Sequence, residues 1–384
     1  MTLKGNERSS PQITVLIPTF NRAQYLVQCL DSIFVQTLPP AQVIIVNDGS
    51  TDNTKNVCDA YQEKIEYLEL DQRGRPGAMN LGLKKVTGDY VWIFDDDDVA
   101  LPDALERLVK PLEENPEYGF SYSTFFYTAE NEETRLLGPV LHELKIPNLA
   151  TRGFLIPLLE WNFLGGAGLF TRTSCYREAG DFDPELLRSA DYEMAIRLAR
   201  RFKGIFVSGG PTFHYRQHEG MRGPSHDRFS STFLLRKWFS YNQKFFRKLY
   251  DQIPMTEYLP PGVSANGKMR QALLQRIAIM SYKLLIPETV KDLNALASLP
   301  DQTPFSQEEY RIIRDMMTKS SYEDIGTILD HPEFFDEIRR LAASSTVIRL
   351  LRAKVIRAIL ARYRSHLNLG QFPEILYRII HLYF

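Results

Sequence analysis

Residues 89–105 read DYVWIFDDDDVALPDAL and join a short apolar and aromatic run to four consecutive aspartates. A run of about six such residues is too short for a helix and is typical of a buried strand. Pro102 stands at the first turn of the helical pattern that follows, which is a helix-start signal. Asp95 to Asp98 therefore form, by prediction, an acidic turn between a strand and a helix.

The same alternation extends over the first 130 residues. Strands are predicted over 13–18, 42–47, 65–70 and 89–94, and helices over 22–36, 52–63, 76–86 and 102–113. This alternation predicts a parallel, doubly wound α/β sheet. In such a sheet ligands bind beyond the carboxyl ends of the strands, so the residues that follow each strand are the candidates for a site.

After residue 118 the pattern loosens. Three further elements are predicted there: a strand over 119–127, a helix over 191–202 and a strand pair over 204–218. From about residue 231 only helical periodicity is visible. We therefore predict an α/β domain over 1–230 and an all-helical domain over 231–384.

Composition excludes several classes of protein. The 384 residues are 44% hydrophobic and 24% charged, which excludes disordered and collagen-like chains. A formal net charge of −1 gives no sign of a nucleic-acid partner. The three cysteines are too far apart to predict a disulfide framework or a zinc site. No apolar run has the length of a membrane span and no signal peptide is recognisable, so a cytoplasmic protein is expected.

Mostly polar residues stand at the ends of three of the predicted strands. They are Pro18, Thr19 and Asn21 after the first, Asn47 and Asp48 after the second, and Asp95 to Asp98 after the fourth. Adjacent carboxylates repel one another, and Mg²⁺ or Mn²⁺ bound with a substrate's phosphates would relieve that repulsion. The alternatives are a solvated acidic turn and, for the Asn-Asp-Gly-Ser string, an ordinary turn with a helix cap.

Three motifs in series resemble the nucleotide-sugar-binding half of family 2 glycosyltransferases, over roughly residues 12–220. They are PTFNRAQYLVQCLDSIFVQT at 18–37, VIIVNDGSTDNT at 43–54 and GAMNLGLKKVTGDYVWIFDDDDVALPDAL at 77–105. The resemblance implies a GT-A (Rossmann-like) fold. It also implies inverting transfer from a nucleoside-diphosphate sugar, of UDP or dTDP type, to an acceptor hydroxyl in glycan or glycoconjugate biosynthesis.

The resemblance implies roles for individual residues. The implied nucleotide-sugar-binding residues are Pro18, Thr19, Asn21, Asn47, Asp48, Arg75, Asp96 and Asp97, with Asn47 and Asp48 at the base. The implied ligands of Mn²⁺ or Mg²⁺ are Asp95, Asp97, Asp98 and His218. Arg75 is included because Met79 stands where the family commonly has an arginine that binds the donor. Arg73 is the alternative source of that positive charge.

Asp191 is the predicted catalytic base. It lies in LLRSADYEMAIRLARR at 186–201, which resembles the family's Glu-Asp pair at the start of a helix. Ala190 stands where the family has glutamate, which weakens any role for that first carboxylate. Glu193 is the fallback base, and a plain helix cap is the alternative reading of Asp191.

The C-terminal segment is basic. Residues 341–384 hold seven basic residues against one acid, a net charge of +6, which leaves −7 on residues 1–340. An amphipathic pattern over 345–364 predicts either peripheral membrane contact through 345–384, at the inner face, or an ordinary helix of a bundle. The acceptor is accordingly lipid-linked in the first case and a glycan, polypeptide or small molecule in the second.

Two other functions stay open on the sequence. A nucleotidyltransferase also uses acidic residues at strand ends, although the glycine- and lysine-rich triphosphate loop is absent after the first strand. A catalytically inert nucleotide-binding scaffold, whose helical domain binds a partner, is the non-enzymatic alternative.

Overall fold

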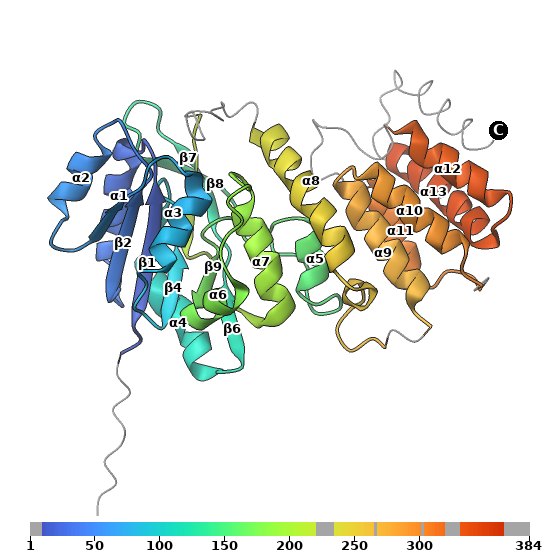
Figure 1. Ribbon diagram of the computed structural model, residues 1–384, viewed down its shortest axis with the longest axis horizontal. Coiled ribbons are helices and arrows are strands. Elements are labelled where there is room, and N and C mark those ends of the chain that lie inside the picture. Colours follow the sequence, from blue (N-terminus) through green and yellow to red (C-terminus); the bar gives the residue numbers. More distant parts are fainter. Residues whose placement is uncertain (1–9, 220–233, 265–266, 301–302, 319–330, 365–384) are drawn as a thin grey trace, which may run out of the picture. The chain divides into compact units, whose positions relative to one another are not determined.

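The computed structural model describes residues 10–219, 234–264, 267–300, 303–318 and 331–364 (Figure 1). The chain forms two compact units. The sheet unit consists of residues 1–147 and 162–234, and the helical unit of residues 148–161 and 235–384. The fourteen residues 148–161 therefore belong to the helical unit, and the chain then returns to the sheet unit at residue 162. No sequence signal predicted this excursion.

Seven strands form the main sheet, in the order β10-β6-β9-β4-β1-β2-β3. They are β1 (Ile13–Thr19), β2 (Gln42–Asn47), β3 (Glu66–Glu69), β4 (Tyr90–Ile93), β6 (Tyr118–Tyr122), β9 (Leu169–Arg172) and β10 (Lys203–Phe206). The strands β4, β1, β2 and β3 run parallel, as predicted. Strand β9 is antiparallel to both β4 and β6, so the sheet as a whole is mixed.

A smaller sheet has the order β5-β11-β7-β8. Its strands are β5 (Val99–Ala100), β7 (Phe126–Glu130), β8 (Leu137–Glu143) and β11 (Phe213–Gln217). Two predictions are wrong here: residues 119–127 contribute to two strands, β6 and β7, and residues 204–218 do not form a strand pair. Instead β10 pairs with β6, and β11 pairs with β5 and β7. Gly209 and Gly210, with φ of +94° and +90°, lie in the connection that takes the chain from one sheet to the other.

Helices of the sheet unit lie between the strands, as the alternation predicted. They are α1 (Ala23–Phe34), α2 (Thr54–Ala60), α3 (Gly74–Leu83), α4 (Ala104–Glu114), α6 (Thr173–Ala179) and α7 (Ala190–Arg201). Parallel pairing brings the strand ends together, because Thr19 lies beside Asn47 and the backbone N–H of Phe94 donates to the carbonyl of Leu16 at 2.9 Å. The carboxyl ends of β1, β2 and β4 thus share one edge.

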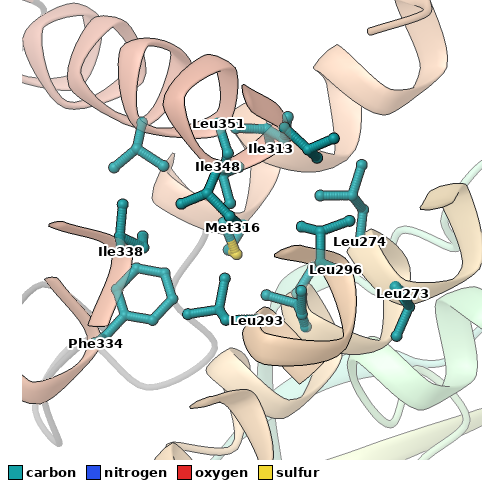
Figure 2. Packing of buried hydrophobic residues seen from close by; sticks show 14 of the residues in the cluster. Leu273, Leu274, Leu293, Leu296, Ile313, Met316, Phe334, Ile338, Ile348 and Leu351 are labelled. Carbon is teal, nitrogen blue, oxygen red and sulfur yellow. The ribbon is translucent and has the colours of Figure 1, made fainter. Parts of the chain in front are cut away.

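The helical unit has its own hydrophobic core (Figure 2). Its helices are α5 (Leu155–Glu160), α8 (Leu234–Gln252), the 3-10 helix η3 (Met255–Tyr258), α9 (Met269–Tyr282), α10 (Ile286–Ala297), α11 (Gln307–Thr318), α12 (Pro332–Ala342) and α13 (Thr346–Arg364). The five helices α9 to α13 supply most of the buried side chains, among them Leu274, Leu293, Ile313, Phe334 and Ile348. An α/β domain with a helical C-terminal region, the predicted fold class, is confirmed.

Helix α13 decides between the two readings of the basic C-terminal segment, as far as it is described. Val347, Ile348, Leu351 and Val355 are buried in the helical core. This apolar face therefore packs against neighbouring helices and is not available to a membrane. Residues 365–384, which the membrane prediction also includes, lie outside the described residues. Among the described helices, none combines the length and the apolar character that a membrane crossing requires.

Candidate active site

Asn47 and Asp48 form the end of β2. The side-chain amide of Asn47 donates to the hydroxyl of Tyr67 at 2.8 Å. Both carboxylate oxygens of Asp48 accept hydrogen bonds from backbone N–H groups at the start of α3, from Arg73 at 2.8 Å and Gly74 at 2.7 Å. Burial raises the pKa of Asp48, and these two amides oppose the rise. Asp48 thus fixes the start of α3 against the strand end where the base is predicted to bind.

The turn after β1 is tied to the turn after β2. Pro18 and Thr19 are buried at the strand end, and Asn21 follows with a φ of +51°. The backbone N–H of Asn21 donates to the Ser50 hydroxyl and the backbone N–H of Thr51 donates to the Asn21 side chain, both at 2.8 Å. These crossed hydrogen bonds hold the two polar turns together as one surface.

Asp95, the first aspartate after β4, is paired with Arg75 of α3. Burial raises the pKa of Asp95, and Arg75 opposes the rise. Burial alone would lower the pKa of Arg75, but the carboxylates of Asp95, Asp191 and Asp96 raise it above its ordinary value. The guanidinium therefore lies among several carboxylates. Arg75, rather than Arg73, brings positive charge to this place.

Asp97 lies beside a histidine and an arginine. Its Oδ2 is 3.0 Å from His218 Nε2 and 3.9 Å from an Arg22 guanidinium nitrogen. Burial raises the pKa of neighbouring Asp96 to about 7; repulsion from Asp97 adds to the rise, and Arg22 opposes it. The part of the shift that comes from Asp97 reflects negative charge close by, which a cation would relieve.

A divalent cation fits this corner of the site. Among the residues that the structure describes, no three His, Cys, Asp or Glu side chains converge to hold a metal on their own. A cation that also binds a substrate's phosphates needs only one or two carboxylates from the protein. Asp97, with His218 at its side, meets that need. Asp95 and Asp98, the other predicted ligands, are paired with Arg75 and with a backbone N–H of β11.

Arg216 of β11 holds the aspartate turn in place. Its side chain is 1% exposed, its backbone N–H donates to Asp98 Oδ1 at 3.0 Å, and its Nε donates to the carbonyl of Asp97 at 2.7 Å. The guanidinium also lies 5.1 Å from the ring centroid of Tyr25. These contacts of Arg216 with the backbone and carboxylate of the acidic turn fix the shape of that turn.

A small pocket opens beside the Arg75–Asp95 pair. Its lining residues come from α3, β4, α6, α7, β9 and two loops, and they are Arg75, Met79, Ile93, Leu164, Gly165, Gly166, Leu169, Tyr176, Phe182, Asp191, Met194 and Ala195. Asp191 lies in the first turn of α7, where acidic side chains are favoured. Glu193, the fallback base, is absent from the lining and pairs with Arg197 at 2.8 Å.

Residues 14–176 match the family described as Glycosyl transferase family 2. The matched segment holds the ends of β1, β2 and β4 with the polar turns described above. It is a family 2 glycosyltransferase domain. The resemblance seen in the sequence is confirmed, and the match ends before Asp191 and His218.

Curated relatives of this glycosyltransferase domain are longer proteins. The chain is 29% identical over 197 residues to an uncharacterized glycosyltransferase of Rickettsia felis, over 50% of this chain and 32% of that protein. It is 40% identical over 106 residues to glycosyltransferase GlyA of Streptococcus pneumoniae serotype 4, over 27% of this chain and 15% of that protein. The chain thus spans about a third or less of the length of these two relatives.

Solved structures share the fold. TarS 1-349 of S. aureus in complex with UDP-GlcNAc matches with a TM-score of 0.51 at 15% identity, over 92% of each chain. The structure of S. aureus TarS 1-349 matches with a TM-score of 0.50, also at 15% identity, over 92% of this chain and 91% of that chain. Likeness at this identity establishes the fold, and the predicted GT-A fold of the glycosyltransferase domain is confirmed.

Several residues of the site escaped the sequence analysis. Arg22, which lies beside Asp97, belongs to the motif at 18–37, but no role was predicted for it. Tyr176 and Phe182 of the pocket carry no sequence signal. Asn80 holds Phe182 in place through two backbone contacts, at 2.8 and 2.9 Å, across about a hundred residues of chain. Such long-range contacts leave no local pattern.

Proposed function

We propose that this protein is an inverting glycosyltransferase that moves a sugar from a nucleoside-diphosphate sugar to the hydroxyl of an acceptor. One observation carries the proposal: Asp191 lines the same pocket as Arg75, whose guanidinium pairs with Asp95 in the acidic turn after β4. A base and a donor-phosphate site must face one sugar from opposite sides for inversion. This pocket has Asp191 on one wall and Arg75, the partner of Asp95, on another.

The chemical step follows from these positions. Asp191 takes the proton of the acceptor hydroxyl, and the acceptor oxygen forms a bond to the anomeric carbon. The bond from that carbon to the β-phosphate oxygen breaks, and the nucleoside diphosphate leaves with the electron pair. Arg75 places positive charge near the developing negative charge of the leaving group. Mn²⁺ or Mg²⁺, held by Asp97 and His218 when bound, supplies further charge stabilisation to the diphosphate.

The donor nucleotide is proposed to be UDP or dTDP. The place of Asn47 at the base is implied by the family; in the structure its buried side-chain amide donates to the Tyr67 hydroxyl and accepts from the backbone N–H of Ser50. The fold shared with TarS, whose structure contains UDP-GlcNAc, supports UDP as the first nucleotide to test. Ribose and diphosphate contacts are assigned to Asp96 and Asp97, and the neighbouring walls to Pro18, Thr19 and Asn21.

The acceptor class is proposed more broadly. A glycan, a lipid-linked saccharide or a polypeptide offers the hydroxyl that Asp191 requires, and glycan or glycoconjugate biosynthesis is the setting implied by the family. The buried face of α13 supports the reading of this helix as an ordinary helix of a bundle. A cytoplasmic location stays a prediction from the sequence.

Calorimetric titration with UDP, dTDP, GDP and ADP, with and without Mn²⁺, tests the proposal. The wild type should bind one pyrimidine nucleotide in the presence of Mn²⁺, and Asp97→Ala should lose the metal-dependent part of that affinity. Asp103→Ala, an exposed aspartate at the start of α4, is the matched control and should bind like the wild type. Absence of binding by every diphosphate would refute the proposal.

Turnover separates an enzyme from an inert scaffold. A bound nucleotide sugar that is neither hydrolysed nor transferred to any acceptor fraction would favour the scaffold. Release of pyrophosphate from a nucleoside triphosphate would favour the nucleotidyltransferase, for which no structural observation speaks.

A further inference from the structure

The pocket beside the Arg75–Asp95 pair is built entirely from the sheet unit. Helix α3 contributes Arg75 and Met79 to its lining, and α7 contributes Asp191, Met194 and Ala195. Side chains three or four residues apart lie on the same face of a helix. Each helix therefore presents a charged side chain from its first turn and apolar side chains from its second turn.

The charged and the apolar lining residues differ in burial. The side chain of Arg75 is 25% exposed, and Asp191 is also partly exposed. The apolar side chains are almost completely buried, with an exposed fraction of 1–4%. The pocket thus has charged groups near the solvent and an apolar floor beneath them. This floor consists of Met79, Ile93, Leu164, Phe182 and Met194.

Contacts within the sheet unit hold the floor in place. The backbone N–H of Phe182 donates to the side-chain oxygen of Asn80 at 2.8 Å, and the Asn80 amide donates to the carbonyl of Phe182 at 2.9 Å. Asn80 follows Met79 on α3, so this bridge fixes Phe182 against the helix that carries Met79. The free space in the pocket admits about one water-sized group. The floor therefore accepts only a small group.

The floor favours a methyl group over a hydroxyl. Its side chains offer no hydrogen-bond donor, and the thioethers of Met79 and Met194 are weak acceptors. A hydroxyl buried there would give up its hydrogen bonds to water without a replacement, which is unfavourable. A methyl group in the same place leaves water for apolar surroundings, which is favourable.

We propose that the floor receives the methyl group of a 6-deoxyhexose, so that the donor is a nucleoside-diphosphate 6-deoxyhexose. The inference rests on the proposed function, which puts the donor sugar in this pocket. The ring hydroxyls of such a sugar stay at the charged end, beside Arg75 and Asp191. Its C6 lies outside the ring and carries no oxygen, which suits the floor. An acetamido group also ends in a methyl, but its amide needs hydrogen-bond partners and more room than one water-sized group occupies.

Calorimetry in the presence of Mn²⁺ tests the inference with pairs of donors that differ only at C6. The pairs are UDP-glucose with UDP-6-deoxyglucose, UDP-galactose with UDP-6-deoxygalactose, and their dTDP counterparts. The 6-deoxy member of at least one pair should bind at least tenfold more tightly. The expected upper limit is about a hundredfold, because an apolar site rejects an added hydroxyl by about that factor.

Variants of Met194 test the role of the floor. Met194→Gln places an amide where the C6 hydroxyl would lie, so the preference within the pair should fall below threefold. Met194→Leu keeps the floor apolar and should keep a preference of at least tenfold. Met79→Gln is the second test should Met194→Gln fail to fold. Met269→Gln, at an exposed position at the start of α9, is the control and should bind like the wild type.

Affinity for the nucleoside diphosphate alone separates loss of the sugar contact from loss of structure. It should change less than twofold in the floor variants, because the floor is proposed to contact only the sugar. Equal affinities within every pair would overturn the inference and leave the proposed function standing. So would tighter binding of UDP-N-acetylglucosamine than of any 6-deoxy donor, an unchanged preference in both glutamine variants, or an equal loss of preference in Met194→Leu. Absence of binding by every nucleoside diphosphate would refute the proposed function, and this inference with it.

Discussion

Lys283→Met should flatten the pH dependence of the stability of the helical unit. The ammonium group of Lys283 is completely buried, 2.8 Å from the carbonyl of Glu160 and 4.5 Å from the ring centroid of Phe246. Burial lowers its pKa from 10.5 to about 7, and the Glu160 carboxylate opposes the fall. Above pH 10.5 the amine is neutral in both the folded and the unfolded chain, so it contributes no pH dependence there.

As the pH falls below 10.5, the unfolded chain takes up the proton before the folded chain does. The free energy of unfolding therefore falls as the pH is lowered from 10.5 to 7, and below pH 7 this loss of stability stays constant. One pKa unit corresponds to about 1.4 kcal/mol, so the full loss is about 5 kcal/mol, and most of it, about 3 kcal/mol, develops between pH 10 and pH 7. Methionine cannot donate to the Glu160 carbonyl, but that cost of about 1–3 kcal/mol is independent of pH.

Urea unfolding at pH 7, 8.5 and 10, followed by circular dichroism, measures the effect. The free energy of unfolding of Lys283→Met minus that of the wild type should be about 3 kcal/mol more favourable at pH 7 than at pH 10. Lys291→Met is the control, because Lys291 is 70% exposed and only 3.9 Å from Asp251, a weak surface pair. A difference for Lys283→Met that is as independent of pH as that of the control would refute the reasoning.

Three further outcomes are expected. Asp191→Asn should lower sugar transfer at least 100-fold with nucleotide affinity unchanged, because a general base contributes about 10²–10⁴ in rate; kinetics with calorimetry checks this. Gly166→Ala should reduce transfer at least tenfold, because its Cβ would lie 2.4 Å from Asp95 Oδ2; unchanged kinetics would contradict the close approach of the Gly166 backbone to Asp95. Asp52→Ala removes a carboxylate that accepts from the starts of α1 and α2, at 3.1 and 3.0 Å, so the free energy of unfolding should fall by about 1–2 kcal/mol, as urea denaturation can show.

The strand ends were predictable because their signals are local. Asn47, Asp48 and the aspartates directly follow short apolar runs, and parallel pairing of β1, β2 and β4 places them at one edge. The position of Asp191 in the first turn of α7 was equally readable. Which arginine supplies the positive charge was not readable, because Arg73 and Arg75 lie equally close to the start of α3 in the sequence. Only the fold shows that Arg75 pairs with Asp95.

The sequence by itself determined the alternation of the four parallel strands with the first four helices, the polar turns of the site and the family of residues 14–176. Those features depend on residue spacing and turn chemistry within a few positions. Only the tertiary structure decided that β9 returns antiparallel between β4 and β6, that α5 belongs to the helical unit, and that α13 buries its apolar face. Each of these is a choice among partners far apart in the chain. Such a choice is settled by the free energy of packing the whole core, which no local pattern contains.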